Sequence, residues 1–217
     1  MAYDLEEQEQ LATLQDFWKK YGNLIMTALI IVLGSYAAYN YYKHYQRKQG
    51  TEASVLYDQM QTSLVGKDNA KVQRVAADVQ SKYKDSAYAQ MAALSAAKSA
   101  FDANDTKTAK AQLQWVVDNG NDEYKSIARL RLSGVLLDEK AYDAALAVIS
   151  TGVQPQFAGA VQDRKGDILV AQNKVAEARA AYLAALAAMD EKNPGRQLVT
   201  IKLEAIGGTA PAPKAAA

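Results

Sequence analysis

The first 50 residues contain one long apolar run. No charged side chain occurs between Tyr21 and Tyr42. A helix over residues 23–42 would span roughly 30 Å, which matches the hydrocarbon core of a bilayer. Aromatic residues lie at both ends of the run, and lysines and arginines lie close to them, as the lipid–water interface favours. The pattern therefore predicts a transmembrane helix over 23–42.

Two other interpretations of this run are weaker. A cleaved signal peptide should begin with a short basic region, whereas five acids precede the run and no clear small-residue cleavage site follows it. A buried core helix would need a charge-free surface on every face, which is rare in a domain of this size. The orientation of the helix stays open, because two lysines precede the run and three basic residues follow it.

The rest of the chain follows a helical pattern. From Thr51 to Ile206 apolar residues recur at spacings of three and four, and no alternating stretch indicates a strand. Breaks rich in Asn, Asp, Gly and Lys mark out roughly nine helices. Some breaks hold residues whose side-chain oxygens can accept the free amides of a first helical turn. These candidate N-caps are Asp85 or Ser86, Asp105 or Thr106, and Asp122.

Small residues recur in this region with a regular spacing. Three pairs are each 12 residues apart, and successive pairs are offset by 36 and 33 residues: Ala97 and Ala109, Ser133 and Ala145, and Gly166 and Ala178. The tetratricopeptide repeat, a helical hairpin of about 34 residues, has small residues at two such positions, where its helices cross closely. The match is degenerate, because the aromatic residue usual at the fourth position is absent. We predict tetratricopeptide-like hairpins at about 90–119, 126–153 and 159–190, a less regular one at 51–83, and a final helix at about 194–206.

These patterns predict an all-α fold and divide the chain into four parts. They are an acidic N-terminal segment at 1–22, the transmembrane helix at 23–42, the repeat domain at 43–206 and a disordered tail at 207–217. The tail is rich in Gly, Pro and Ala and has little to bury.

Composition argues against most enzyme classes. The chain has 217 residues, no cysteine and one histidine, His44. It therefore cannot form a thiolate metal site, and it has few ways to assemble a Ser-His-Asp triad. It has no glycine-rich phosphate loop, and its net charge of +1 gives no sign of nucleic-acid binding. We predict no catalytic residues, no metal and no cofactor.

Four residues are candidates for binding a partner. The inner helices of a hairpin stack form an extended concave surface, which can recognise polypeptide. Arg129, Arg131 and Arg164 are candidates for such a surface, although ordinary surface charge is the commoner role of an arginine. Trp115, the one tryptophan outside the N-terminal region, is either an anchor for a partner or a packing residue.

The order of these parts resembles the YfgM family, the ancillary subunit of the bacterial Sec translocon. The resemblance covers about residues 6–206. It rests on FWKKYG at 17–22, KTAKAQLQ at 107–114, ARLRL at 128–132, YDAAL at 142–146, KGD at 165–167 and VTIKL at 199–203. It implies a single-pass inner-membrane protein with a cytoplasmic N-terminus and a periplasmic repeat domain. It also implies association with the SecYEG channel, the periplasmic chaperone PpiD and newly translocated polypeptides.

Two functions fit these observations. The first is a non-enzymatic, chaperone-like interaction module that is anchored in the membrane at the Sec translocon and aids newly translocated proteins. The alternative is a tetratricopeptide scaffold for another cell-envelope assembly complex, which would have the same fold. An enzyme is the least supported class, because the sequence offers so few catalytic groups.

Overall fold

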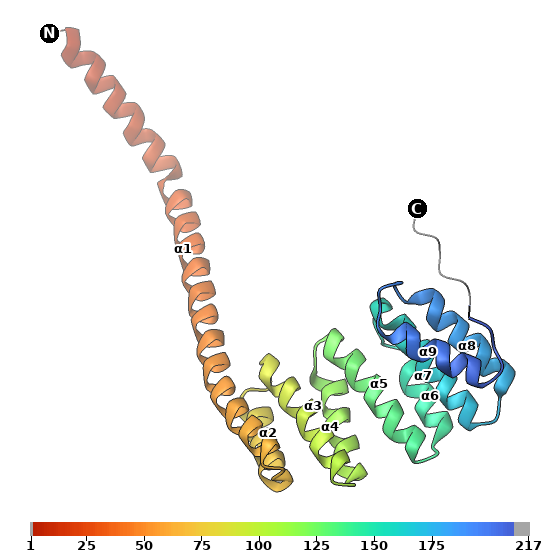
Figure 1. Cartoon of the computed structure of the whole chain (residues 1–217). Coiled ribbons are helices and arrows are strands. Elements are labelled where there is room, and N and C mark those ends of the chain that lie inside the picture. The colour runs from red at the N-terminus through yellow and green to blue at the C-terminus, as the bar shows by residue number, and fades with distance from the viewer. Residues whose placement is uncertain (1, 211–217) are drawn as a thin grey trace. The chain divides into compact units, whose positions relative to one another are not determined.

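The computed structural model describes residues 2–210, with side chains described from residue 9 onward. These residues are helical without strands, which confirms the predicted fold class (Figure 1). The elements are α1 (Ala2–Val65), α2 (Asn69–Lys82), α3 (Ala87–Asp102), α4 (Thr106–Asn119), α5 (Asp122–Asp138), α6 (Tyr142–Ser150), the 3-10 helix η1 (Pro155–Phe157), α7 (Ala158–Ala171), α8 (Val175–Ala188) and α9 (Gly195–Ala205).

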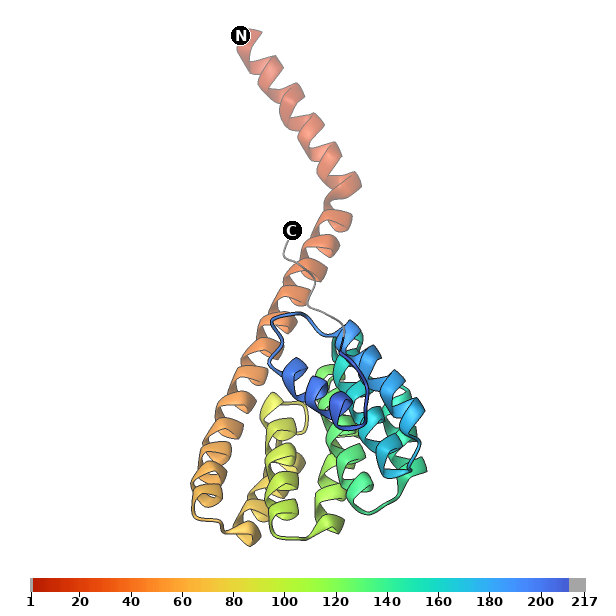
Figure 2. The ribbon, with the colours of Figure 1, turned by 45° about the vertical axis from the view of Figure 1, so that its right-hand side comes forward.

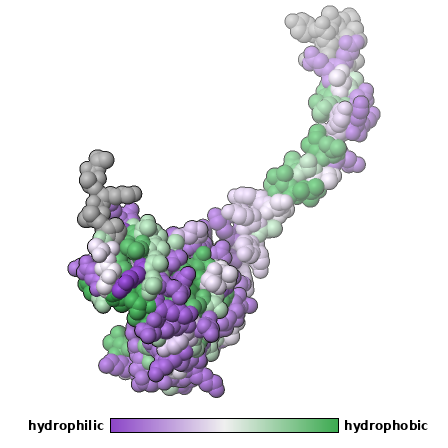
Figure 3. All heavy atoms as spheres, turned by 90° about the vertical axis from the view of Figure 1, so that its right-hand side faces the viewer, coloured by the Kyte–Doolittle hydropathy of each residue, from purple (hydrophilic) through white to green (hydrophobic). Residues whose placement is uncertain are grey.

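The chain forms two compact units, which divide between Thr51 and Glu52 within α1. The first unit is a single helix that exposes its apolar side chains, as the green surface along it shows (Figure 3). Its most apolar 18-residue window is only 6% buried, and the helix is long and apolar enough to cross a membrane. The hydroxyl of Thr27, the one threonine in the run, donates to the carbonyl oxygen of Asn23 at 2.7 Å, so its polar group is satisfied within the helix. The chain therefore does not use the apolar run as a core helix.

The second unit is a series of helical hairpins. Each helix from α2 to α9 packs against the next, and α5 also contacts α7 (Figures 1 and 2). The hairpins are the end of α1 with α2, then α3 with α4, α5 with α6, and α7 with α8, and α9 follows as a single helix. Four clusters of buried apolar residues run through the unit, with alanines prominent among them.

The six small residues singled out in the sequence are all buried. The Ser133 hydroxyl donates to the carbonyl oxygen of Ala145 at 2.9 Å, which joins α5 to α6 where they cross. At Gly166 an added Cβ would lie 2.3 Å from Cε1 of Tyr182, so the aromatic ring of α8 rests directly on the α7 backbone. Larger side chains at these two positions would push the helices of each hairpin apart.

The turn inside each hairpin has the same geometry. One residue takes a left-handed conformation, with φ between 53° and 62°, and the four residues are Lys67, Asn104, Lys140 and Asn173. In each turn the next amide donates to a carbonyl oxygen five residues back, as in Asp105 to Ala100 at 2.8 Å. The first hairpin therefore has the same turn geometry as the three later ones, despite its irregular sequence.

The predicted N-caps are partly corrected. Ser86 and Asp105 cap α3 and α4 with their side chains. For α5 the cap is Asn121 and not Asp122, because Asn121 has extended backbone and its side chain accepts the amide of Tyr124 at 3.0 Å. Asp122 already lies inside the first turn.

The segment after α9 turns back onto the domain. The amide of Gly208 donates to the carbonyl oxygen of Leu203 at 2.9 Å, and Ala210 packs against the last core cluster. The Arg179 guanidinium also donates to the carbonyl oxygen of Ile206. Residues 211–217, the remainder of the predicted tail, lie outside the described residues.

Candidate functional site

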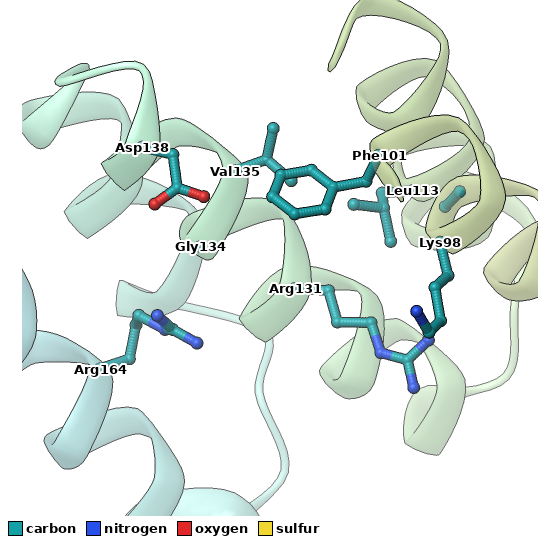
Figure 4. Close-up of a pocket in the computed structure, with 9 residues that line it drawn as sticks. Lys98, Phe101, Leu113, Arg131, Gly134, Val135, Asp138 and Arg164 are labelled. Carbon is teal, nitrogen blue, oxygen red and sulfur yellow. The ribbon is translucent and has the colours of Figure 1, made fainter. Parts of the chain in front are cut away.

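The second unit contains a cleft between the first helices of three successive hairpins, α3, α5 and α7 (Figure 4). We call it the inner cleft. Its cavity volume is about 310 Å³, enough for one or two side chains of a partner. Its lining residues are Ala97, Lys98, Phe101, Leu113, Arg131, Gly134, Val135, Asp138 and Arg164.

The floor of the inner cleft is apolar. Leu113 and Val135 are almost fully buried beneath it, whereas Phe101 is 40% exposed. The ring of Phe101 projects from α3 toward α5 (Figure 4). Ala97 and Phe101 lie on one face of α3 because they are four residues apart, and Arg131, Val135 and Asp138 share one face of α5 for the same reason.

The rim of the inner cleft carries three cations and one acid. The Lys98 ammonium pairs with Asp102 at 2.5 Å, and the Arg164 guanidinium lies 3.7 Å from an oxygen of Asp167. Arg131 is exposed and has no ion pair among the described residues. Its side chain extends toward Lys98, another cation (Figure 4). The rim therefore offers one arginine that no carboxylate of the described residues neutralises.

Gly134 sets how Arg164 enters the inner cleft. A Cβ at Gly134 would lie 3.5 Å from the guanidinium of Arg164, so the planar group rests on the α5 backbone. A methyl group at this position would meet the guanidinium in ordinary van der Waals contact, whereas a side chain longer than that of alanine would compete with it for space. The sequence ARLRLSG in α5 thus provides both an arginine of its own and a surface for the arginine of α7.

A polar network behind the rim holds α7 in place. Asp167 accepts from the Tyr182 hydroxyl at 2.9 Å and from the Lys202 ammonium at 3.0 Å, so it joins α7 to α8 and α9. Lys202 also lies 2.8 Å from Asp163. Burial, together with the hydrogen bond to Asp167, raises the pKa of the Tyr182 hydroxyl above its usual range. The helix that carries Arg164 is therefore fixed by the final helix of the domain.

The structure brings together two of the four predicted partner-binding residues. Arg131 and Arg164 both line the inner cleft, although they are 33 residues apart. Arg129 does not line it. Its guanidinium packs against Gly152, whose φ is 70°, and its Nε is buried without a hydrogen-bond partner among the described residues. Trp115 is half-buried and packs against two core clusters, so most of its ring serves the fold.

Sequence reasoning missed Lys98, Phe101 and Asp138 as cleft residues. A weak signal exists, because Phe101 is a large aromatic residue at the end of a helix whose other apolar residues are mostly alanine. Its exposure could not be read from periodicity alone, because it depends on how closely α3 and α5 approach.

The hairpins define a tetratricopeptide-like helical repeat protein with a candidate membrane helix. A family model described as a tetratricopeptide repeat-like domain matches residues 15–208. A relative from Neisseria gonorrhoeae, named ancillary SecYEG translocon subunit, is 35% identical over 95% of this chain and 100% of its own length. A relative of the same name from Haemophilus influenzae is 32% identical over 82% of this chain and 91% of its own. No solved structure matches. The chain belongs to the YfgM family, as its motifs indicated.

Proposed function

We propose that this protein is a non-enzymatic binding module that is anchored in the inner membrane beside the Sec translocon. Its repeat domain helps newly translocated proteins in the periplasm. The observation that carries this proposal is the full-length similarity to ancillary SecYEG translocon subunits, which covers 95% of this chain and includes both the apolar helix and the repeats.

Anchoring gives such a module a physical advantage. A weak binder held near a channel exit meets its ligand at a high effective concentration, so it can act without high intrinsic affinity. The apolar helix with its aromatic flanks supplies the contact with membrane lipid. The inner cleft supplies a surface for polypeptide.

The topology of the proposal comes from the family resemblance. Residues 1–22 are cytoplasmic, 23–42 cross the membrane and 43–206 are periplasmic. Protease added to spheroplasts is expected to digest the repeat domain and to leave a fragment that contains the N-terminal segment. Protection of the repeat domain until the inner membrane is permeabilised would contradict this orientation.

The partners of the proposal are the SecYEG channel, the chaperone PpiD and unfolded or newly translocated polypeptides. A photo-crosslinker in place of Phe101, which is 40% exposed in the inner cleft, is expected to capture one of these in native membranes. The same crosslinker at Arg74, an exposed position on α2 outside the cleft, is the matched control. If the crosslinker at Phe101 captures none of these partners, the proposal is contradicted.

A further inference from the structure

The inner cleft places an apolar subsite next to Arg131, which has no ion pair within the described part of the chain. We propose that it binds an extended, unfolded stretch of polypeptide in which an apolar side chain lies next to an Asp or Glu. The apolar side chain enters between Phe101 and Val135, and the carboxylate binds Arg131. This inference rests on the proposed function, since it names the chemistry that the repeat domain recognises.

The apolar half of the subsite is built but incomplete. Phe101 is 40% exposed although Leu113 and Val135 beneath it are almost fully buried, so a face of the ring remains open to a partner. Covering an exposed aromatic ring beside a buried aliphatic floor is a common way to gain binding free energy. A leucine, phenylalanine or similar side chain fits this chemistry and the cavity of about 310 Å³.

The charged half favours an acid, because three cations line the cleft and Asp138 is the one acid beside them among its lining residues. Lys98 and Arg164 each have a carboxylate on their own helix, at 2.5 Å and 3.7 Å, whereas Arg131 has none among the described residues. Arg131 also extends toward Lys98 (Figure 4), so two like charges share one side of the cleft. Because Lys98 is already paired with Asp102, the charge that a bound carboxylate would neutralise is that of Arg131, whose guanidinium can bind it through two parallel hydrogen bonds.

The carboxylate belongs to a side chain and not to a chain terminus. A polypeptide that leaves a channel N-terminus first presents its internal residues long before its C-terminus is free. An internal Asp or Glu is therefore the acid that the module meets.

The test measures fluorescence anisotropy of short labelled peptides with the purified full chain in mild detergent. Three peptides with blocked termini share a Gly/Ser background and carry Leu-Glu pairs, Leu-Gln pairs or Ala-Glu pairs. The Leu-Glu peptide is expected to bind about five- to tenfold more tightly than each of the other two. This preference for Glu over Gln should shrink as salt is added, because an exposed charge pair is screened.

Two variants assign the preference to residues. Arg131→Gln should abolish the difference between Leu-Glu and Leu-Gln peptides. Arg74→Gln, the same change at an exposed position outside the cleft, should retain it. Phe101→Ala should weaken both leucine peptides and leave the Ala-Glu peptide nearly unchanged. Thermal melts of each variant confirm that the repeat domain is folded.

Several results would overturn the inference. They are equal binding of Glu and Gln peptides, a Glu preference that survives Arg131→Gln, no binding of any blocked peptide, or binding only of peptides with a free C-terminal carboxylate. Failure here leaves the crosslinking result at the translocon untouched. Loss of translocon crosslinks with an intact peptide preference would instead contradict the proposed function alone.

Discussion

Gly34 and Gly166 are both glycines inside helices, but an added methyl group would have quite different neighbours at the two positions. At Gly34, in the apolar helix of the first unit, nothing lies within 4 Å of an added Cβ. At Gly166, in the second unit, the ring of Tyr182 lies 2.3 Å away. The same substitution is therefore expected to be silent in one region and damaging in the other.

The difference follows from what each region packs against. Most of the described side chains of the first unit are exposed, so their free energy depends on the solvent around the helix and on depth in a membrane. Those of the second unit pack against neighbouring helices, so their free energy depends on the space available at each crossing. The first unit is therefore expected to tolerate substitutions that change the shape of a side chain, whereas the second unit is expected to tolerate few of them.

The largest expected effect is a charge in the apolar helix. Ile30→Arg should reduce insertion by about 3 kcal/mol, because an arginine near the middle of a span is poorly solvated. Ile30→Leu is the matched control and should insert normally. Carbonate extraction of membranes measures the change, and full retention of the arginine variant in the membrane fraction would count against the assigned span.

The next effect tests the glycine comparison itself. Gly166→Ala should destabilise the repeat domain by about 1–3 kcal/mol, because overpacking against Tyr182 outweighs the gain in helix propensity. Gly134→Ala, where the nearest atoms are 3.5 Å away at the end of the Arg164 side chain, should be neutral or stabilising. Urea unfolding compares the two variants, and Gly34→Ala should leave the transition unchanged. A Gly166→Ala protein as stable as the parent would mean that the crossing is looser than described.

A smaller effect comes from the turns inside the hairpins. Asp68 and Asp105 follow their left-handed residues and cap the next helix through their side chains, whereas Ala141 has nearly the same backbone angles and no side-chain hydrogen bond. Ala141→Asp should therefore stabilise the domain by about 0.5–1 kcal/mol. Ala141→Val, which cannot accept a hydrogen bond, should not. A thermal shift no larger for Asp than for Val would exclude the capping explanation.

The smallest effect is a dependence on pH. The hydrogen bond from Lys110 at 2.5 Å, and then that from Thr106, hold the pKa of Glu139 below its usual value of 4.5. Because the pKa is lower in the folded state, this stabilisation is present above about pH 4.5 and is lost as the pH falls further. Glu139→Gln should flatten the stability profile slightly in that range and change little at pH 7. Acid titration followed by circular dichroism measures this, and an unchanged profile would show that the pair contributes nothing.

The fold was largely predictable because its signals are periodic. The spacing of Ala97, Ser133 and Gly166 predicts where the helices cross, and all three residues are buried. The first hairpin was harder to predict, because it shares with the later hairpins the left-handed backbone angle of Lys67 and no side-chain motif.

The inner cleft was predictable only in part. Arg131 and Arg164 were candidates because arginine often binds partners. Arg129 differs from Arg131 only by its face on α5, and periodicity alone does not say which face borders a cleft. The exposure of Phe101 depends on contacts between hairpins, which no local pattern records. Local sequence patterns thus predicted the helices, whereas the cleft could be identified only from the way the helices pack.

The central claim is that the anchored repeat domain works beside the Sec translocon, and co-purification tests it most directly. The tagged full chain would be isolated from native membranes in mild detergent, with an Ile30→Arg variant as the control for anchoring. The account predicts that the SecYEG channel subunits co-purify with the parent chain and are depleted with the variant. Recovery of a different cell-envelope assembly complex, without channel subunits, would contradict the account.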